Sequence, residues 1–232
     1  MILSKGRAGK IHVGYFLMFF SALTSVASAQ NKDVELLRRI NSAESDFKNN
    51  FFAVTSNTTY VVNMAVPAAI GLRGIVKHDQ RLKEEALYMG GGLVLTSVLA
   101  QGMKRIILRE RPFEVYPDIV KRTNGGGYSM PSGHTAAAFY TAASLSFWHP
   151  RWYVVVPAFT WASLVGYGRI YQGVHYPSDV LVGALLGSGT AWFTFKSQKW
   201  MQHRKKKREN NKGFYTKVTL LLVQKLPRIM PM

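Results

Sequence analysis

The 232-residue chain contains no cysteine and few acidic residues, with 12 Asp and Glu against 30 Lys and Arg and a formal net charge of +18. The absence of cysteine excludes disulfides, thiolate metal sites and a cysteine nucleophile. The scarcity of acidic residues favours a polyanionic partner: a nucleic acid, an anionic membrane surface or a phosphorylated ligand.

Charged residues are also missing from long stretches of the chain. Lys, Arg, Asp and Glu are absent from residues 51–72, 86–103, 125–150, 152–168 and 180–195. A helix needs about 20 apolar residues to cross a bilayer, and each stretch is near that length. Buried helices of soluble proteins can look similar, but five such stretches joined by short polar links favour membrane spans. We therefore predict an all-α fold, a multi-span helical membrane bundle with about five transmembrane helices over residues 51–196.

The start of the chain resembles an export signal. Lys5, Arg7 and Lys10 precede the apolar run HVGYFLMFFSALTSV, and Ala27-Ser28-Ala29 has the small residues of a cleavage site. We expect residues 1–29 to be a signal peptide; the alternative is an uncleaved membrane anchor. Residues 30–50 have apolar side chains at helical spacing (Val34, Leu37, Ile40 and Phe47), which predicts an amphipathic helix. That helix either lies on a membrane surface or packs on the body of the protein.

The basic residues predict the orientation. The tail 197–232 carries the run Lys205-Lys206-Lys207-Arg208, so we expect it to be cytoplasmic. As a membrane-side tail it needs no nucleic acid partner, and we expect none. The link 104–124 breaks the pattern, because it carries six basic residues and the span count places it outside: Lys104, Arg105, Arg109, Arg111, Lys121 and Arg122. Such charges suggest phosphate binding, although ordinary headgroup contact would account for Arg105, Lys121 and Arg122.

Two short clusters contain the residues that can do chemistry. Pro131-Ser132-Gly133-His134 precedes an apolar run, and a helix that starts there would direct unpaired N–H groups at an anion beside the His134 imidazole. In the second cluster Pro177 predicts another helix start, with His175 just before it and Asp179 in its first turn. Asp179 can then orient the His175 imidazole for nucleophilic attack. The span count puts both clusters on the outer face together with Arg111.

These motifs resemble one known signature. Lys104-x6-Arg111-Pro112, Pro131-Ser132-Gly133-His134 and Arg169-x5-His175-x3-Asp179 occur in the order and spacing of the type 2 phosphatidic acid phosphatase superfamily. The resemblance implies that Lys104, Arg111, Arg169 and the amides of Ser132 and Gly133 bind phosphate. It implies that His175 attacks phosphorus, Asp179 orients it, and His134 serves as general acid and then base. It requires no metal or other cofactor.

One position departs from the signature, because Gly168 stands where the family usually has serine. A hydroxyl contact to phosphate is then lost, which costs on the order of 1 kcal/mol.

The resemblance implies a lipid phosphatase of the bacterial inner membrane with its site facing the periplasm. Its substrate would be a lipid phosphate among the membrane lipids. We expect lipid A first and undecaprenyl diphosphate second, with phosphatidylglycerophosphate or phosphatidic acid also possible. Two other classes remain open: an oxidase similar to vanadium haloperoxidases, and a non-catalytic protein that binds anionic lipid.

Overall fold

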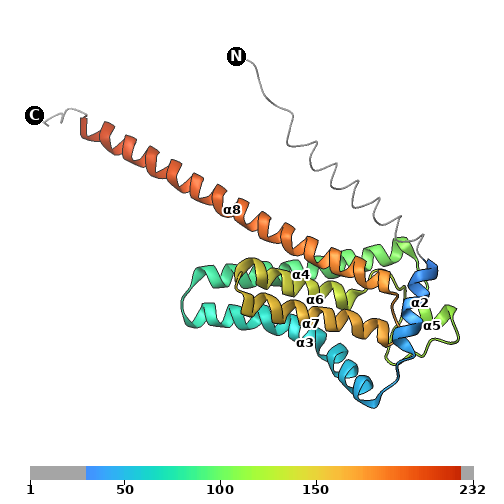
Figure 1. Cartoon of the computed structure of the whole chain (residues 1–232). Coiled ribbons are helices and arrows are strands. Elements are labelled where there is room, and N and C mark those ends of the chain that lie inside the picture. The colour runs from blue at the N-terminus through green and yellow to red at the C-terminus, as the bar shows by residue number, and fades with distance from the viewer. Residues whose placement is uncertain (1–29, 226–232) are drawn as a thin grey trace, which may run out of the picture.

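The computed structural model describes residues 30–225, and every regular element in that range is a helix. The predicted signal peptide, residues 1–29, lies outside the described residues. The helices are α2 (Gln30–Asn41), α3 (Asp46–Val76), α4 (Gln80–Ile107), α5 (Pro112–Val115), α6 (Gly133–Trp148), α7 (Trp152–Tyr171) and α8 (Pro177–Lys225). Helices α3, α4, α6, α7 and the first part of α8 run side by side as a bundle (Figure 1).

The predicted all-α class is therefore confirmed. The five apolar segments fall within α3, α4, α6, α7 and α8, with the third helix starting only at Gly133. By length and composition, two helical stretches among the described residues could cross a membrane, Asp46–Val76 and Gln80–Val115. Helix α6 has 16 residues, or about 24 Å at 1.5 Å per residue, which is shorter than the hydrocarbon core of a bilayer. The number of five spans remains a prediction.

Helix α3 has its polar face inward and its apolar face outward. Ser56, Thr59 and Asn63 are buried against the bundle, whereas Val61 and Met64 are each 65% exposed. Helix α4 also exposes apolar side chains (Leu87, Val94 and Val98), and its buried face combines polar Thr96 and Lys104 with apolar Met89 and Leu93. In water such an arrangement would expose much apolar area, but in a bilayer it places the apolar side chains in lipid.

Helix α6 lies at the centre of the bundle and packs against α3, α4, α7 and α8. Its buried surface consists largely of alanine, which lets neighbouring helices come close. On α8, the residues facing it are glycines: a Cβ on Gly183 would lie 2.7 Å from the Ser132 carbonyl oxygen, and one on Gly187 would lie 2.1 Å from that of Ala136. The close crossing brings the first turns of α6 and α8 together.

This crossing predicts a clear stability effect. Gly187→Ala should lower the free energy of unfolding by about 1–3 kcal/mol or more, because the added methyl overlaps the α6 backbone. Gly189→Ala is the matched control on the same helix: its Cβ would meet nothing within 4 Å, so it should be neutral or slightly stabilising. Thermal unfolding in detergent measures both. Equal melting temperatures for the two variants would contradict the close crossing.

The amphipathic segment is shorter than expected, and it packs on the body of the protein. Helix α2 ends at Asn41, and Phe47 belongs to α3, where it is 74% exposed. Val34 and Leu37 are buried in a cluster with residues of the 104–124 link and of the segment from α7 to α8 (Ile119, Ile170 and Tyr176). Helix α2 is thus joined to the body of the protein, and its position on a membrane surface remains a prediction.

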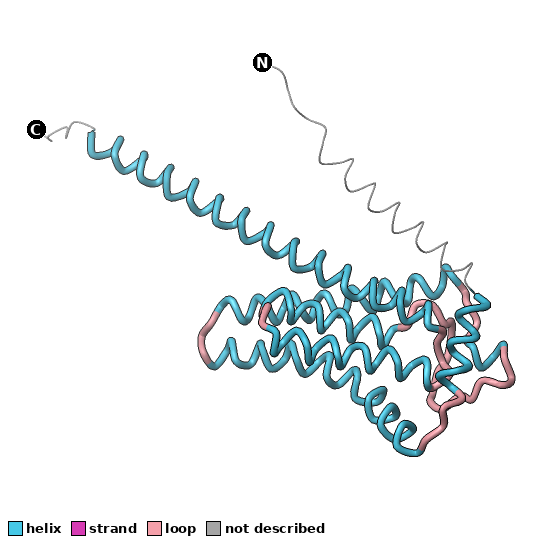
Figure 2. Tube along the Cα trace, viewed as in Figure 1, coloured by secondary structure: helices cyan, strands magenta, loops and turns pink. Residues whose placement is uncertain are grey.

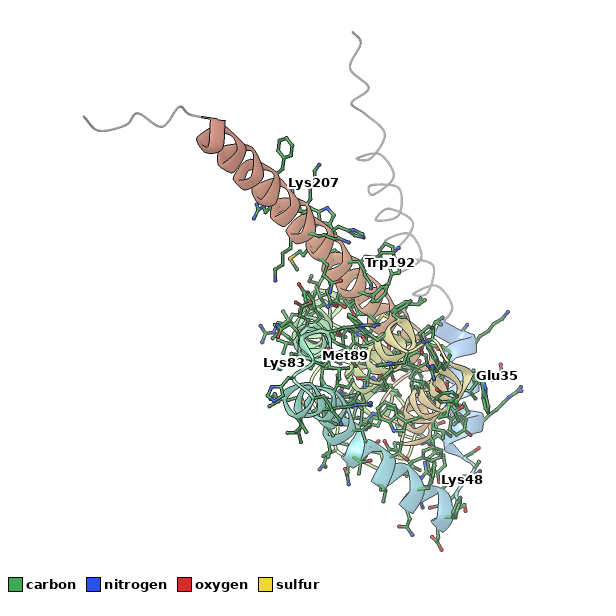
Figure 3. All side chains as sticks on the ribbon, turned by 90° about the vertical axis from the view of Figure 1, so that its left-hand side faces the viewer. Glu35, Lys48, Lys83, Met89, Trp192 and Lys207 are labelled. Carbon is green, nitrogen blue, oxygen red and sulfur yellow. The ribbon has the colours of Figure 1, made fainter. Side chains whose placement is uncertain are left out.

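Helix α8 continues without a break through position 196, where we expected the membrane domain to end. Its C-terminal part extends beyond the other helices (Figure 1), and Lys207 projects from that part, whereas Met89 lies within the bundle (Figure 3). The basic tail is thus helical over the described residues up to Lys225.

The long loops gather at one end of the bundle, beside α2 and α5, while short turns join α3 to α4 and α6 to α7 at the other end (Figure 2). The looped end contains the C-terminal ends of α4 and α7 and the N-terminal ends of α6 and α8. Three segments far apart in the sequence therefore meet there.

Candidate active site

A cavity of about 390 Å³ opens at the looped end of the bundle. Its lining includes six of the eight predicted site residues: Lys104, Arg111, Gly133, His134, Arg169 and His175. The lining also contains Arg105, Tyr60 and the glycine run 125–127, and it contains no Asp or Glu among the described residues. The lining therefore concentrates positive charge and contributes no carboxylate, which suits an anion. Asp179 and Ser132 lie behind this surface, and both are fully buried.

The start of α6 differs in detail from the expectation. The helix begins at Gly133, with Ser132 as its N-cap residue, so Pro131 precedes the helix and is not in its first turn. The Ser132 N–H, expected to face the anion, donates instead to the Asp179 carbonyl oxygen at 3.0 Å. The Ser132 hydroxyl accepts from Thr135 Oγ1 at 2.9 Å. The expected Ser132 amide contact is thus wrong: Ser132 joins the two helix starts, which leaves the amides of Gly133 and His134 for an anion.

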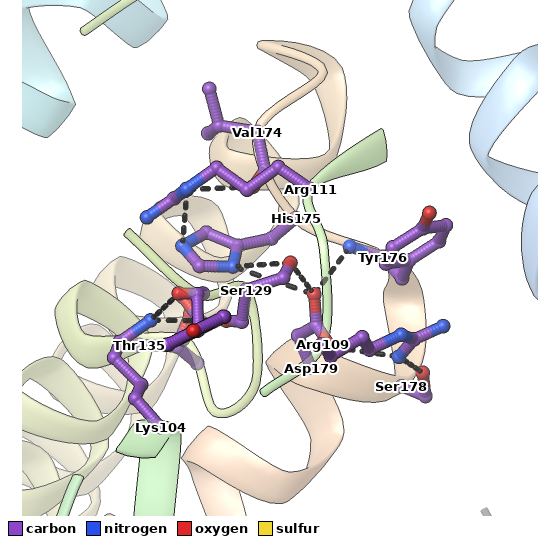
Figure 4. A network of polar contacts seen from close by, with 12 residues as sticks. Lys104, Arg109, Arg111, Ser129, Thr135, Val174, His175, Tyr176, Ser178 and Asp179 are labelled. Carbon is purple, nitrogen blue, oxygen red and sulfur yellow. Dashed lines mark hydrogen bonds and ion pairs between the residues drawn. The ribbon is translucent and has the colours of Figure 1, made fainter. Parts of the chain in front are cut away.

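Arg111 is held rigidly by carbonyl oxygens. Its Nε donates to Gly127 at 2.9 Å and its Nη2 to Gly126 at 2.9 Å. Its Nη1 donates to Val174 at 2.8 Å (Figure 4). A guanidinium has five N–H groups, so two remain after these contacts. Nη1 lies 3.4 Å from His175 Nε2, which places the guanidinium beside that ring nitrogen in the cavity.

Lys104 and Arg169 supply the other cations. Lys104 Nζ donates to the carbonyl oxygens of Tyr128 and Ser129, so it also anchors the loop before α6. Arg169 Nη1 contacts Ser56 Oγ at 3.2 Å and the side-chain oxygen of Gln172 at 3.1 Å. Arg169 Nε is buried and has no hydrogen-bond partner. A buried donor without a partner is costly, and a bound anion beside the guanidinium would reduce that cost.

His175 sits as the second motif predicted, in the loop just before α8. The helix starts at Pro177, and Asp179 in its first turn accepts from the Tyr176 amide at 2.8 Å. Gly173 allows the chain to leave α7, since its φ of +72° is a left-handed conformation that glycine adopts without strain. Asp179 Oδ2 then lies 3.5 Å from His175 Nδ1.

Ser129 stands between these two side chains, and the sequence did not point to it. Its hydroxyl donates to Asp179 Oδ2 and lies 3.4 Å from His175 Nδ1 (Figure 4). With a carboxylate and a hydroxyl beside Nδ1, the proton of the neutral ring belongs on Nδ1. The lone pair is then on Nε2, the nitrogen that faces Arg111.

Burial controls the charge of this ring. It lowers the pKa of His175 to about 3; the hydrogen bond and charge of Asp179 oppose this effect, and Arg169 and Arg111 add to it. A lowered pKa means that the imidazole gains its proton only in strong acid. At neutral pH His175 is therefore uncharged and has the free lone pair that a nucleophile requires.

His134, in the first turn of α6, also lines the cavity. Its ring lies against Tyr60 of α3, with 4.5 Å between the ring centroids. Both histidines thus line the same cavity as Lys104, Arg111 and Arg169.

The missing serine at position 168 has a structural explanation. A Cβ on Gly168 would lie 2.7 Å from the Phe52 ring, so Phe52 of α3 occupies the space of that side chain. One turn further along α3, Ser56 brings a hydroxyl to Arg169 and to Gln172. A hydroxyl beside the third-motif arginine is thus present, but it comes from another helix.

This packing predicts that restoring the family's usual residue is harmful. Gly168→Ser should lower kcat/KM for phosphate release about tenfold, because Phe52 must move and overpacking costs about 1–3 kcal/mol. The double variant Gly168→Ser/Phe52→Ala makes room for the new side chain and should recover much of the loss. Steady-state phosphate release measures all three proteins. Higher activity in Gly168→Ser than in the wild type would contradict this explanation.

Known proteins resemble this chain both in its sequence motifs and in its fold. The family model for the PAP2 superfamily matches residues 85–202, which include all three motifs. The chain belongs to the PAP2 superfamily. The crystal structure of Aquifex aeolicus LpxE is similar over 70% of this chain and 94% of that one, with 31% identity and a TM-score of 0.61. A PAP2-type phosphatidylglycerolphosphate phosphatase from Bacillus subtilis has a TM-score of 0.66 at 23% identity, a likeness of fold alone.

Curated PAP2 relatives are named for lipid phosphates. An undecaprenyl-diphosphatase from Sulfolobus acidocaldarius is 37% identical over 105 residues, which cover 45% of this chain and 49% of the relative. A lipid A 4'-phosphatase from Bacteroides thetaiotaomicron is 34% identical over 87 residues, 37% of this chain and 38% of the relative. The chain thus matches about half, or less, of the length of these relatives.

Proposed function

We propose that this protein is a membrane phosphatase that removes phosphate from a lipid through a phosphohistidine intermediate. One observation carries the proposal: four cationic side chains and two histidines line one cavity that has no carboxylate in its described lining. Two comparisons support the proposal: the match to the PAP2 superfamily covers the three motifs, and the relatives are named for lipid phosphates.

In the first step, the phosphate oxygens lie among Lys104, Arg111 and Arg169 and near the free amides at the start of α6. His175 Nε2 attacks phosphorus, the N–P bond forms, and the bond from phosphorus to the lipid oxygen breaks. His134 donates a proton to the leaving oxygen. Asp179 stabilises the positive charge that develops on the His175 ring, and the cations stabilise charge on the phosphate oxygens.

In the second step, His134 takes a proton from water, and the water oxygen attacks phosphorus. The N–P bond breaks, phosphate leaves, and His175 returns to its neutral form. The side chains of this chain perform the acid, base and charge-stabilising roles in both steps, so we propose that turnover requires no metal.

We propose lipid A as the substrate and undecaprenyl diphosphate as the second candidate. The cavity lies at the ends of helices with outward apolar faces, so a lipid tail can remain in the bilayer while its phosphate enters. The cavity is larger than one phosphate, and Arg105 at its rim suits a headgroup with a second phosphate. We further propose that the site faces the periplasm, opposite the basic tail.

The test is phosphate release by purified full-length protein from lipid A, undecaprenyl diphosphate, phosphatidylglycerophosphate and phosphatidic acid, measured side by side. Release from at least one lipid, inhibition by vanadate and insensitivity to chelators would support the proposal. Inactivation by a chelator that a divalent metal reverses would contradict the metal-free mechanism. Bromide oxidation with vanadate and peroxide would indicate the haloperoxidase class, and lipid binding without phosphate release would indicate a non-catalytic protein.

A further inference from the structure

Asp33 is a buried carboxylate on a surface helix outside the region that the family model matches. It is 7% exposed, whereas its neighbours Lys32 and Glu35 on α2 are exposed. Carboxylates are rarely buried without partners. Asp33 accepts from the Ser178 amide at 2.9 Å, from the Ser178 hydroxyl, and from Arg109 Nη2 at 2.8 Å. Helix α2 thus contributes a charge to the first turn of α8, directly behind the site.

Arg109 connects this carboxylate to the predicted nucleophile. Its Nη2 bonds to Asp33, and its Nη1 bonds to Asp179 Oδ1 at 2.8 Å. The guanidinium lies over the Tyr176 ring, 3.8 Å from its centroid, and the side chain is only 16% exposed. Figure 4 shows Arg109 beside Asp179, on the side away from His175. The chain of contacts therefore runs from Asp33 through Arg109 and Asp179 to His175.

The two oxygens of Asp179 have different partners. Oδ1 is held by Arg109, while Oδ2 accepts from the Tyr176 amide and the Ser129 hydroxyl and faces His175 Nδ1. Arg109 therefore fixes the carboxylate plane, but its positive charge opposes the charge that Asp179 presents to the ring. Asp33 balances that effect. The carboxylates of Asp33 and Asp179 with the guanidinium of Arg109 have a net charge of −1, whereas Asp179 and Arg109 alone would have a net charge of zero.

We propose that Asp33 is a positioning residue for catalysis, acting through Arg109 on Asp179. This role rests on the proposed function, since it concerns the imidazolium that forms when His175 attacks phosphorus. Asp33 lies outside the cavity lining and contacts none of the residues that we assign to phosphate. Its removal should therefore change the chemical step and leave substrate binding unaltered.

The experiment compares Asp33→Asn, Arg109→Gln and the double variant with the wild type. The rate of phosphate release is divided by the concentration of vanadate-binding sites, so that a smaller amount of folded protein does not lower the measured kcat. We expect Asp33→Asn to lower kcat about tenfold, the effect of about 1.4 kcal/mol in transition-state stabilisation, with KM changed less than twofold. In the Arg109→Gln background, adding Asp33→Asn should cause no further loss, because Asp33 acts through that guanidinium.

Arg38→Gln is the matched control, because Arg38 also ties α2 to the body. Its Nε bonds to Asp118 at 2.7 Å, in an ion pair that is about half exposed and includes neither Asp179 nor His175. This variant should keep wild-type kcat and KM. A wild-type kcat in Asp33→Asn, or independent losses that multiply in the double variant, would overturn the positioning role while the phosphatase proposal stands. A wild-type protein that releases no phosphate from any lipid would overturn both.

Discussion

His175→Ala should reduce phosphate release by a factor of about 10⁴ or more, because it removes the imidazole that we propose as the nucleophile. The fold should survive this change. Asp179, the buried group that faces the ring, keeps its bonds from Arg109, the Ser129 hydroxyl and the Tyr176 amide. The measurement is phosphate release from the best lipid substrate, with a rapid acid-free quench that detects labelled phosphate on the protein.

The wild type should show label on histidine during turnover, and the variant should show none. His203→Ala serves as the control, since His203 is exposed on the part of α8 that follows the predicted last span, far along the chain from the three motifs. It should retain full activity and labelling. Near-normal turnover in His175→Ala would refute the phosphohistidine mechanism, whichever lipid proves to be the substrate.

His134→Ala should lower turnover of a lipid phosphate by about 10³-fold, within the 10²–10⁴ typical of general acid–base catalysis. The alkoxide of a lipid alcohol is a poor leaving group, so its departure requires a proton from His134. p-Nitrophenolate is stable without a proton, so the first step on p-nitrophenyl phosphate should be affected far less. The second step still needs His134 to activate water, so phosphoenzyme should accumulate with this substrate.

Burst kinetics with p-nitrophenyl phosphate measure that accumulation directly. The His134→Ala protein should release one equivalent of nitrophenol quickly and then turn over slowly, and labelled phosphate should remain on His175. The double variant His134→Ala/His175→Ala should show neither the burst nor the label. Equal losses on both substrates, without a burst, would show that His134 has another role.

Local features of the site could be predicted from the sequence because they depend on residues close together in the chain. Pro177 begins a helix, so His175 precedes it and Asp179 falls in its first turn, and the structure has this arrangement. The alternation of charge-free segments with polar links likewise predicted helices in the right places. The start of α6 differs from the prediction: Ser132 is the N-cap and Pro131 lies outside the helix. The Ser132 amide pairs with the Asp179 carbonyl oxygen on another helix, a contact that no local pattern indicates.

The three motifs, their spacing and the membership of the PAP2 superfamily could therefore be read from the sequence alone, because helix starts and motif spacings are local properties. The tertiary structure decided which groups support them. Asp33 reaches Arg109 across 76 positions, and Ser56 reaches Arg169 across 113. Such contacts depend on how closely the helices cross, as Gly187 and Ala136 permit. No local pattern encodes that distance, because it results from the packing of all the helices at once.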